Sequence, residues 1–222
     1  MMNCACPANA ALTTIPAQGC AESFGQIQKV AFQRLRKDNG DLNAFTSAAS
    51  IKLLASWTAL MAAANSTKIV VSPYVQAPTT EAGAARTFGG GNETLGGVEM
   101  VIGREPTKFN GVLRAVPQSI IKAMKELQCE AIADNLGIFL FDENGNIACI
   151  QDATTETTFY PIPIRALFVG DKSFGGLEAP DNNAISWSFL PNYSDHLVIV
   201  SPTDFNPLAD LKAAVESGPV NP

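Results

Sequence analysis

The sequence predicts an α+β fold made mainly of antiparallel β-sheet, with one helix packed on the sheet and extended segments at both ends. Short runs of β-branched and aromatic residues, separated by turn residues, fill most of the second half of the chain. One stretch near the middle has a single apolar stripe at helical spacing, formed by Ile120, Ile121, Met124 and Leu127. With 222 residues, of which 46% are hydrophobic and 16% charged, the chain is long enough to bury one sizeable core.

The first part of the chain is expected to hold an arm, an ambiguous segment and a helix. Residues 1–25 are small and polar and contain prolines, which is typical of an irregular N-terminal arm. Residues 26–37 fit neither the strand period nor the helical one, and a turn follows at Asn39-Gly40-Asp41. A helix is predicted over 47–64, with Ser47 or Thr46 as its cap and Asn65 at its end. Apolar residues recur there at helical spacing: Leu53, Trp57, Leu60, Met61 and Ala64.

A strand over 67–72 is expected to end at Pro73, and a long glycine-rich loop over 73–97 follows it. Residues 83–97 of this loop read GAARTFGGGNETLGG. Because glycine adopts backbone angles closed to other residues, such a loop either bends sharply or lets another group approach the backbone closely. That group is a phosphate in an enzyme and a neighbouring subunit in an assembling protein. Two strands are predicted after the loop, over 98–103 and 109–116.

The second half is predicted to be one helix followed by strands. Pro117 suits the start of the amphipathic helix, which runs to Cys129. An Asn-Gly turn at 144–145 joins strands over 136–141 and 147–151 in a hairpin. The segment 160–168 alternates but contains two prolines, which suits an edge strand. Further strands are expected over 185–189 and 197–200, and a final helix over 207–216 has Asn206 as its cap.

Composition excludes several classes of function. The net charge is −6 and the only basic cluster, Arg34, Arg36 and Lys37, is expected to be a solvated face, so tight binding of nucleic acid is not expected. No segment approaches the roughly 20 apolar residues of a membrane span, and no signal peptide is recognisable. The five cysteines are expected to be free thiols. Cys4, Cys6 and Cys20 have an unusual spacing for zinc, so we expect no metal.

No catalytic motif is present, and we expect neither an enzyme nor a cofactor. The glycine-rich loop lacks the lysine and the following helix of a phosphate-binding loop. The single histidine, His196, lies in a polar turn, and the chain has no G-x-S-x-G motif. Cys129 has no basic neighbour to activate it and is expected to be a packing residue.

Over about residues 65–200 the order of the segments resembles that of phage major tail proteins, the tail-tube family. The segments are TKIVVSP, the long Ala/Gly/Thr loop, VEMVIG, FNGVLR, PQSIIKAMKEL and the hairpin around DENGN. The resemblance implies a β-sandwich with a flanking helix, in a subunit that stacks as hexameric rings. It assigns 98–116 and 136–151 to a barrel-forming sheet, 117–129 to the flanking helix and 77–97 to an inter-ring loop.

The resemblance also implies a division of the chain into an N-terminal arm (1–25), a tail-tube-like β domain (26–202, with the long loop at 73–97) and a C-terminal helix and arm (203–222). The partners would be other copies of the chain and other tail or head–tail connector proteins, in a virion made in the bacterial cytoplasm. DNA would pass the lumen without specific binding, and no membrane is involved. The expected contact residues of the loop are Arg86, Phe88, Gly89, Gly90, Gly91 and Asn92.

Other functions remain open on the sequence. They are another virion structural role (capsid decoration, head completion or tail termination), the inner tube of a contractile injection system, and a small-ligand module or enzyme that uses the glycine loop. The sequence departs from the long uninterrupted strands of a tube at Pro106 and at Asn110-Gly111.

Overall fold

The computed structural model describes residues 23–90, 97–177 and 179–212. Its strands form one large sheet and a separate two-stranded ribbon. All strand pairings in the described part of the chain are antiparallel. The main sheet runs in the order β12-β8-β7-β10-β11-β6-β3, and it is not closed. The predicted α+β, mainly antiparallel fold is therefore confirmed.

The first half of the sheet has β7 (Leu136–Asp142) at its centre, paired with β1 (Ile27–Arg34) and β8 (Ile147–Gln151). Two short strands and one edge strand complete it: β2 (Ile69–Val71), β9 (Phe159–Tyr160) and β12 (Leu197–Val200). The ambiguous segment 26–37 is thus mainly strand. Its side chains alternate between two buried layers, with Val30 and Phe32 on one side and Ala31 on the other, which removes the polar face that usually marks a strand.

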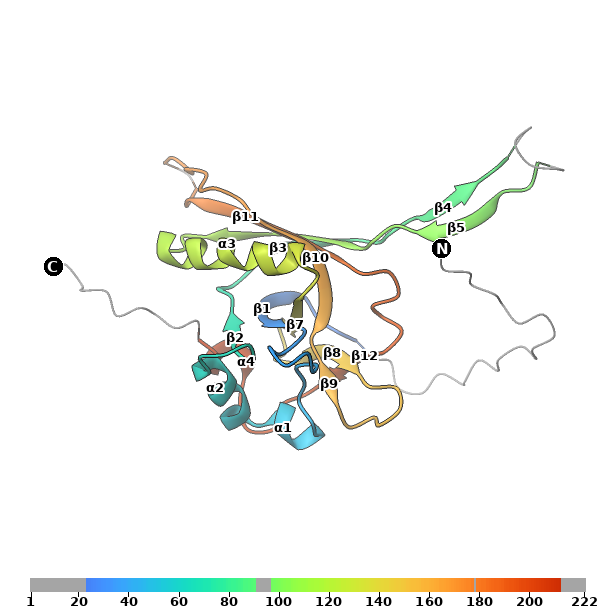
Figure 1. Cartoon of the computed structure of the whole chain (residues 1–222). Coiled ribbons are helices and arrows are strands. Elements are labelled where there is room, and N and C mark those ends of the chain that lie inside the picture. Colours follow the sequence, from blue (N-terminus) through green and yellow to red (C-terminus); the bar gives the residue numbers. More distant parts are fainter. Residues whose placement is uncertain (1–22, 91–96, 178, 213–222) are drawn as a thin grey trace.

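The second half contains β10 (Ile162–Val169), β11 (Asn182–Phe189), β6 (Lys108–Arg114) and β3 (Gln76–Glu81). The helix α3 (Gln118–Ile132) packs between the two halves, with Ile121 and Met124 fully buried, as its apolar stripe predicts. Figure 1 shows α3 lying along the β3–β6–β11 layer.

Two apolar cores lie on opposite faces of the central strands β1 and β7. The first contains Trp187 and lies between the two halves of the sheet, closed by α3. The second contains Trp57 and is covered by α1 (Ala48–Lys52), α2 (Leu54–Ala62) and α4 (Pro207–Asp210), which lie below the sheet in Figure 1.

The structure corrects the predicted helix over 47–64. Ser47 does cap it, with a complete capping box to Ser50, but Leu53 has extended backbone angles and divides the segment into α1 and α2. The break turns Trp57 into the second core, where its indole Nε1 donates to the carbonyl of Ile51 at 2.9 Å. The final predicted helix is also shorter, because Leu211 is already extended. Asn206 caps it as expected, and residues 213–216 lie outside the described residues.

The segment 160–168 is not an edge strand, because β10 lies between β7 and β11. Pro161 precedes the strand and Pro163 is its second residue, so both prolines lie where β10 begins. Only Ile162 and Pro163 pair with β7, after which β10 pairs with β11. A bulge with a left-handed Ala166 then shifts the register. Phe168, which the alternation places in the core, is therefore 53% exposed.

The β7–β8 hairpin and its Asn-Gly turn are confirmed, as are β11 and β12. The strands after the glycine loop are β5 (Met100–Arg104) and β6, which pairs without interruption through Asn110 and Gly111. Pro106 lies between them.

Candidate subunit interface

The prediction of one continuous loop over 73–97 is wrong, because two strands interrupt it. It contains β3 and β4 (Ala85–Phe88), which lead outward, and β5 and β6 bring the chain back. Strands β4 and β5 pair only with each other in the described chain, from Ala85 with Arg104 to Phe88 with Met100. This ribbon, called the arm below, extends well away from the body in Figure 1. Of the glycines predicted to form a loop, Gly89 and Gly90 directly follow β4, whereas Gly83 lies at the base of the arm.

The base of the arm is fixed by close backbone contacts. The Glu105 amide donates to the carbonyl of Ala84 at 2.8 Å. A Cβ atom at Gly83 would lie 1.9 Å from the Glu105 carbonyl oxygen, so only glycine fits there without a backbone shift. The Arg104 guanidinium donates to the Asn192 side chain at 3.0 Å, which ties the arm to the β11–β12 connection.

The arm exposes large apolar side chains on both of its faces. Every residue of β4 is exposed, as is every residue of β5 except the half-buried Gly103. Neighbouring residues of a strand point to opposite faces, and both Val101 and Ile102 are about two-thirds exposed. The exposed apolar residues are Phe88 (53%), Val98 (62%), Met100 (59%), Val101 (69%) and Ile102 (66%). Such a concentration is typical of a surface that a partner covers.

Polar contacts add little to the arm's stability. The described charges are balanced, with Arg86 and Arg104 against Glu99 and Glu105. Among the described residues of the arm and its base, one ion pair joins Arg86 Nε to Glu105 Oε1 at 3.9 Å. Both side chains are more than half exposed, so its contribution is small. A two-stranded ribbon with no covering layer is marginally stable in water. The arm is therefore expected to become stable only when another surface covers its apolar side chains.

The structure places the expected contact residues as follows. Arg86 and Phe88 lie in β4 and are exposed. Gly89 and Gly90 follow with φ of 96° and 109°, in the region that favours glycine. Gly91 and Asn92 lie outside the described residues.

Sequence reasoning missed the larger part of the surface, which lies on the returning strand. The sequence predicted a strand over 98–103, and the resemblance assigned it to a barrel-forming sheet, so its apolar residues Val98, Met100, Val101 and Ile102 were not expected among the contact residues. The available signal was their position, since two strand-like runs that flank a glycine cluster at short range form a hairpin.

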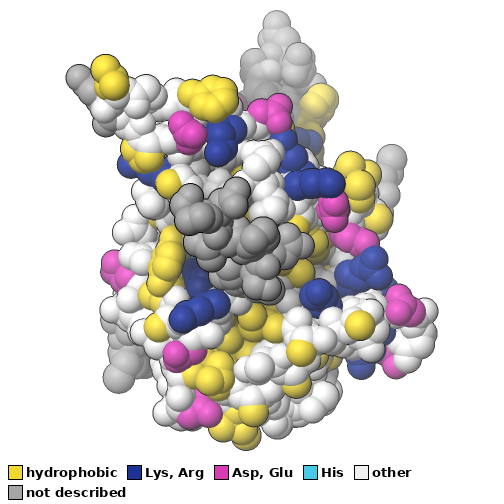
Figure 2. Space-filling view, turned by 90° about the vertical axis from the view of Figure 1, so that its left-hand side faces the viewer, with side chains coloured by type: hydrophobic (Ala, Val, Ile, Leu, Met, Phe, Trp, Pro, Cys, Tyr) yellow, Lys and Arg dark blue, Asp and Glu magenta, His cyan; other side chains and the backbone are white. Residues whose placement is uncertain are grey.

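A second group of exposed apolar residues lies at the opposite end of the molecule. It comprises Phe168, near the end of β10, and Phe174 and Leu177 in the connection between β10 and β11. Figure 1 shows this connection projecting on the side away from the arm. Figure 2 looks onto that side, and hydrophobic side chains are visible along its upper edge.

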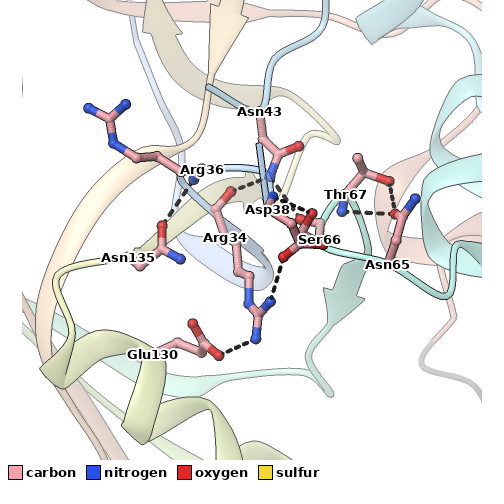
Figure 3. A network of polar contacts seen from close by, with 9 residues as sticks. All are labelled: Arg34, Arg36, Asp38, Asn43, Asn65, Ser66, Thr67, Glu130 and Asn135. Carbon is pink, nitrogen blue, oxygen red and sulfur yellow. Dashed lines mark hydrogen bonds and ion pairs between the residues drawn. The ribbon is translucent and has the colours of Figure 1, made fainter. Parts of the chain in front are cut away.

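A surface groove of about 550 Å³ lies between α3 and the β1–β2 pair and holds a network of polar contacts. Arg34 bridges Glu130 of α3 at 2.5 Å and Asp38 at 3.6 Å (Figure 3). The Asn43 side chain donates to the carbonyls of Arg34 and Ser66, at 2.9 and 2.8 Å. These contacts join β1, α3 and the chain after α2. The polar residues of the groove therefore have a structural role, which is to hold these elements together.

The other reactive side chains do not form a catalytic arrangement in the described part of the chain. His196 is exposed in a turn. Burial raises the pKa of the Cys149 thiol to about 12, which keeps it protonated and unreactive. Cys129 is exposed, so its prediction as a packing residue is wrong. Cys129 lies on the solvent-exposed face of the last turns of α3, away from the face that buries Ala131.

Within the described ranges, no three His, Cys, Asp or Glu residues gather as metal ligands, and Cys4, Cys6 and Cys20 lie outside them. None of the helices described is long and apolar enough to cross a membrane. A search of protein-family profiles found no match to this chain. A search of curated proteins found no match either.

Proposed function

We propose that this chain is a structural subunit that assembles with copies of itself through the arm, as the subunit of a phage tail tube built from stacked rings. The observation that carries the proposal is the arm: two paired strands with uncovered apolar side chains on both faces. Burial of an apolar surface contributes about 25 cal/mol per Å², so covering these side chains strongly favours association.

A second copy of the chain is the partner we propose for the arm, because the chain also has open sheet edges and exposed apolar side chains at its far end. Its sheet is open, and among the described strands β3 and β12 each have a single partner strand. When identical subunits close a ring or stack head to tail, the open sheet edges can pair and the apolar side chains at the far end can be buried. Contacts of this kind between different surfaces of one protein produce rings and tubes.

The tail tube is the specific assembly we propose because the order of segments over about residues 65–200 resembles that of the tail-tube family. In this proposal the arm reaches the adjacent ring, and other tail or head–tail connector proteins bind the ends of the tube in the virion. The net charge of −6 supports a DNA conduit, since a lumen that bound phosphates would retain the DNA.

The test compares the unmodified chain with an arm-shortened variant that lacks residues 84–96. We expect the unmodified chain to form rings or open-ended tubes at high concentration, seen by electron microscopy, and to sediment as a large species. The shortened variant lacks β4 and is expected to stay monomeric, with the near-ultraviolet circular dichroism of the buried Trp57 and Trp187 unchanged. Tubes formed by the shortened variant would contradict the role of the arm.

A finer variant replaces Val101 and Ile102 by serine, which keeps the backbone of the arm. The matched control replaces Leu42, an apolar residue on the body that is 46% exposed, by serine. Assembly should be lost only in the arm variant. A chain that is monomeric at every concentration, and that a small ligand stabilises against heat, would instead indicate a binding module or enzyme.

A further inference from the structure

Lys29 is a buried lysine that contacts the C-terminal segment, residues 206–212. Its side chain, on β1, is only 4% exposed and points into the second core. The Nζ atom donates to the carbonyl of Leu208 at 3.2 Å and to the carbonyl of Leu211. It also lies 5.2 Å above the ring of Tyr74, whose hydroxyl donates to the same Leu208 carbonyl at 2.8 Å. Two residues far away in sequence thus hold this segment.

The charge on Lys29 has no carboxylate partner within ion-pair distance in the described part of the chain. Asp142, on the neighbouring strand β7, uses its carboxylate oxygens to accept from Gly25, Asn144 and Asn146. Asp210 accepts from the Asn206 amide at 2.7 Å. The remaining charged neighbour is Lys212, which repels Lys29. A buried ammonium whose partners are two carbonyls and an aromatic ring, with no carboxylate, is costly to keep charged.

We propose that Lys29 and Tyr74 form a latch on the C-terminal segment, and that the segment opens and closes as a unit according to the charge on Lys29. The segment is suited to this motion because its helix α4 has only four residues and, among the described residues of the segment, only Pro207 and Leu211 are buried. Opening returns the ammonium to water and leaves β1 and β7 in place. This device does not depend on the proposed assembly.

The direction of the pH effect follows from the two states. In the closed state, burial and then the charge of Lys212 lower the pKa of Lys29 below its ordinary value of 10.5, which it regains when the segment opens. The open state therefore binds the proton more tightly, and protonation favours opening. As pH rises through the lowered pKa toward 10.5, the closed state becomes more stable, because a neutral amine still donates to both carbonyls.

Hydrogen exchange of the full chain, followed by NMR, tests the latch. The amides of Leu208, Ala209 and Asp210 are hydrogen-bonded within the segment and report its opening. In Lys29→Ala their protection factors should fall at least tenfold, while those of β7 stay unchanged. The control Lys122→Ala removes an exposed lysine of α3 and should change neither. Equal protection of the segment in the Lys29→Ala and unmodified chains would overturn the proposal.

A second measurement decides the matter even if Lys29→Ala does not fold. Protection factors of the same three amides, corrected for the intrinsic exchange rate, are followed from pH 7 to 10 in the unmodified chain and in Tyr74→Phe, which lacks the tyrosine hydroxyl. Protection should rise with pH in both chains and be lower in Tyr74→Phe at every pH. Protection that is flat or falls with pH in both chains would contradict the role of the Lys29 charge.

Discussion

Asp142 is a fully buried carboxylate at the start of the β7–β8 turn. It accepts hydrogen bonds from the backbone amides of Gly25, Asn144 and Asn146, at 2.7–3.0 Å, and from the Asn146 side chain at 2.9 Å. Burial by itself raises the pKa of Asp142. The hydrogen bonds from Asn146, Gly25 and Asn144 outweigh that effect, so the pKa lies below its usual value. One side chain thereby fixes the hairpin turn and the entry of the chain into β1.

We predict that Asp142→Asn lowers the free energy of unfolding by about 1–3 kcal/mol at pH 7, because an amide cannot accept all of these bonds. The stabilisation by the carboxylate is fully present above its unfolded pKa of about 3.9 and is lost as pH falls through the lowered folded pKa. The difference between variant and unmodified chain should therefore shrink on acidification below about pH 4.

Urea unfolding at pH 7 and pH 3 measures this difference. The control Glu143→Gln changes the neighbouring exposed carboxylate and should have little effect at either pH. An equal loss of stability at both pH values would show that the charge of Asp142 is not what stabilises the turn.

At the scale of elements, the arm depends on a close backbone approach at its base. Gly83 faces the Glu105 carbonyl so closely that a methyl group cannot be placed there without moving the backbone. Gly103, in β5, pairs with Arg86 but has open space where its Cβ would be. Gly83 lies at the base of the arm and Gly103 within β5, so the same Gly→Ala change can be compared where a Cβ atom clashes and where it has space.

We predict that Gly83→Ala breaks the hydrogen bond from the Glu105 amide to Ala84 and that Gly103→Ala preserves it. Exchange of the Glu105 amide should become at least about tenfold faster in Gly83→Ala, a change of roughly 1.4 kcal/mol in local opening. Amides of β7 should be unaffected in both variants. Similar exchange in the two variants would show that the base of the arm adapts to the extra methyl group.

At the scale of the whole molecule, two cores share the strands between them. Val30, Phe32 and Ile138 face the core of Trp187, whereas Phe139 and Phe141 of the same β7 strand face the core of Trp57. The Trp57 ring centroid lies 5.2 Å from that of Phe139 and 5.6 Å from that of Phe141. Because each strand contributes to both layers, loss of one core should destabilise the other.

We predict that Trp57→Ala lowers the free energy of unfolding by about 3–5 kcal/mol and preserves a single transition. The chain has two tryptophans, so in this variant Trp187 alone reports the first core by fluorescence. Its denaturation curve should shift together with the far-UV circular dichroism curve. An unshifted Trp187 transition would mean that the two cores unfold independently.

The sequence predicted best where local chemistry decides the structure. The Ser47 cap, the Asn144-Gly145 turn and the stripe of α3 all depend on residues within one or two turns of each other. It failed where distant contacts decide. The break at Leu53 places Trp57 against β7, and the bulge at Ala166 lets β10 leave β7 and pair with β11.

The candidate interface shows the same division. Glycines at the tip of the arm were recognisable because their backbone requirement is local, and Arg86 and Phe88 were expected beside them. The apolar residues of β5 were not, because a strand that is covered by a core and one that is covered by a partner have the same composition. The latch residue Lys29 was also missed, since only the fold brings residues 208–211 to it.

By itself, then, the sequence determined the class of fold, the positions of its turns and helix caps and a glycine-rich segment suited to close approach. Only the tertiary structure decided that this segment is part of a paired arm, that the apolar side chains of the arm are uncovered, and that the C-terminal segment is held by a buried lysine. The physical reason is that turn and cap geometry is local, whereas burial depends on which distant segments pack together.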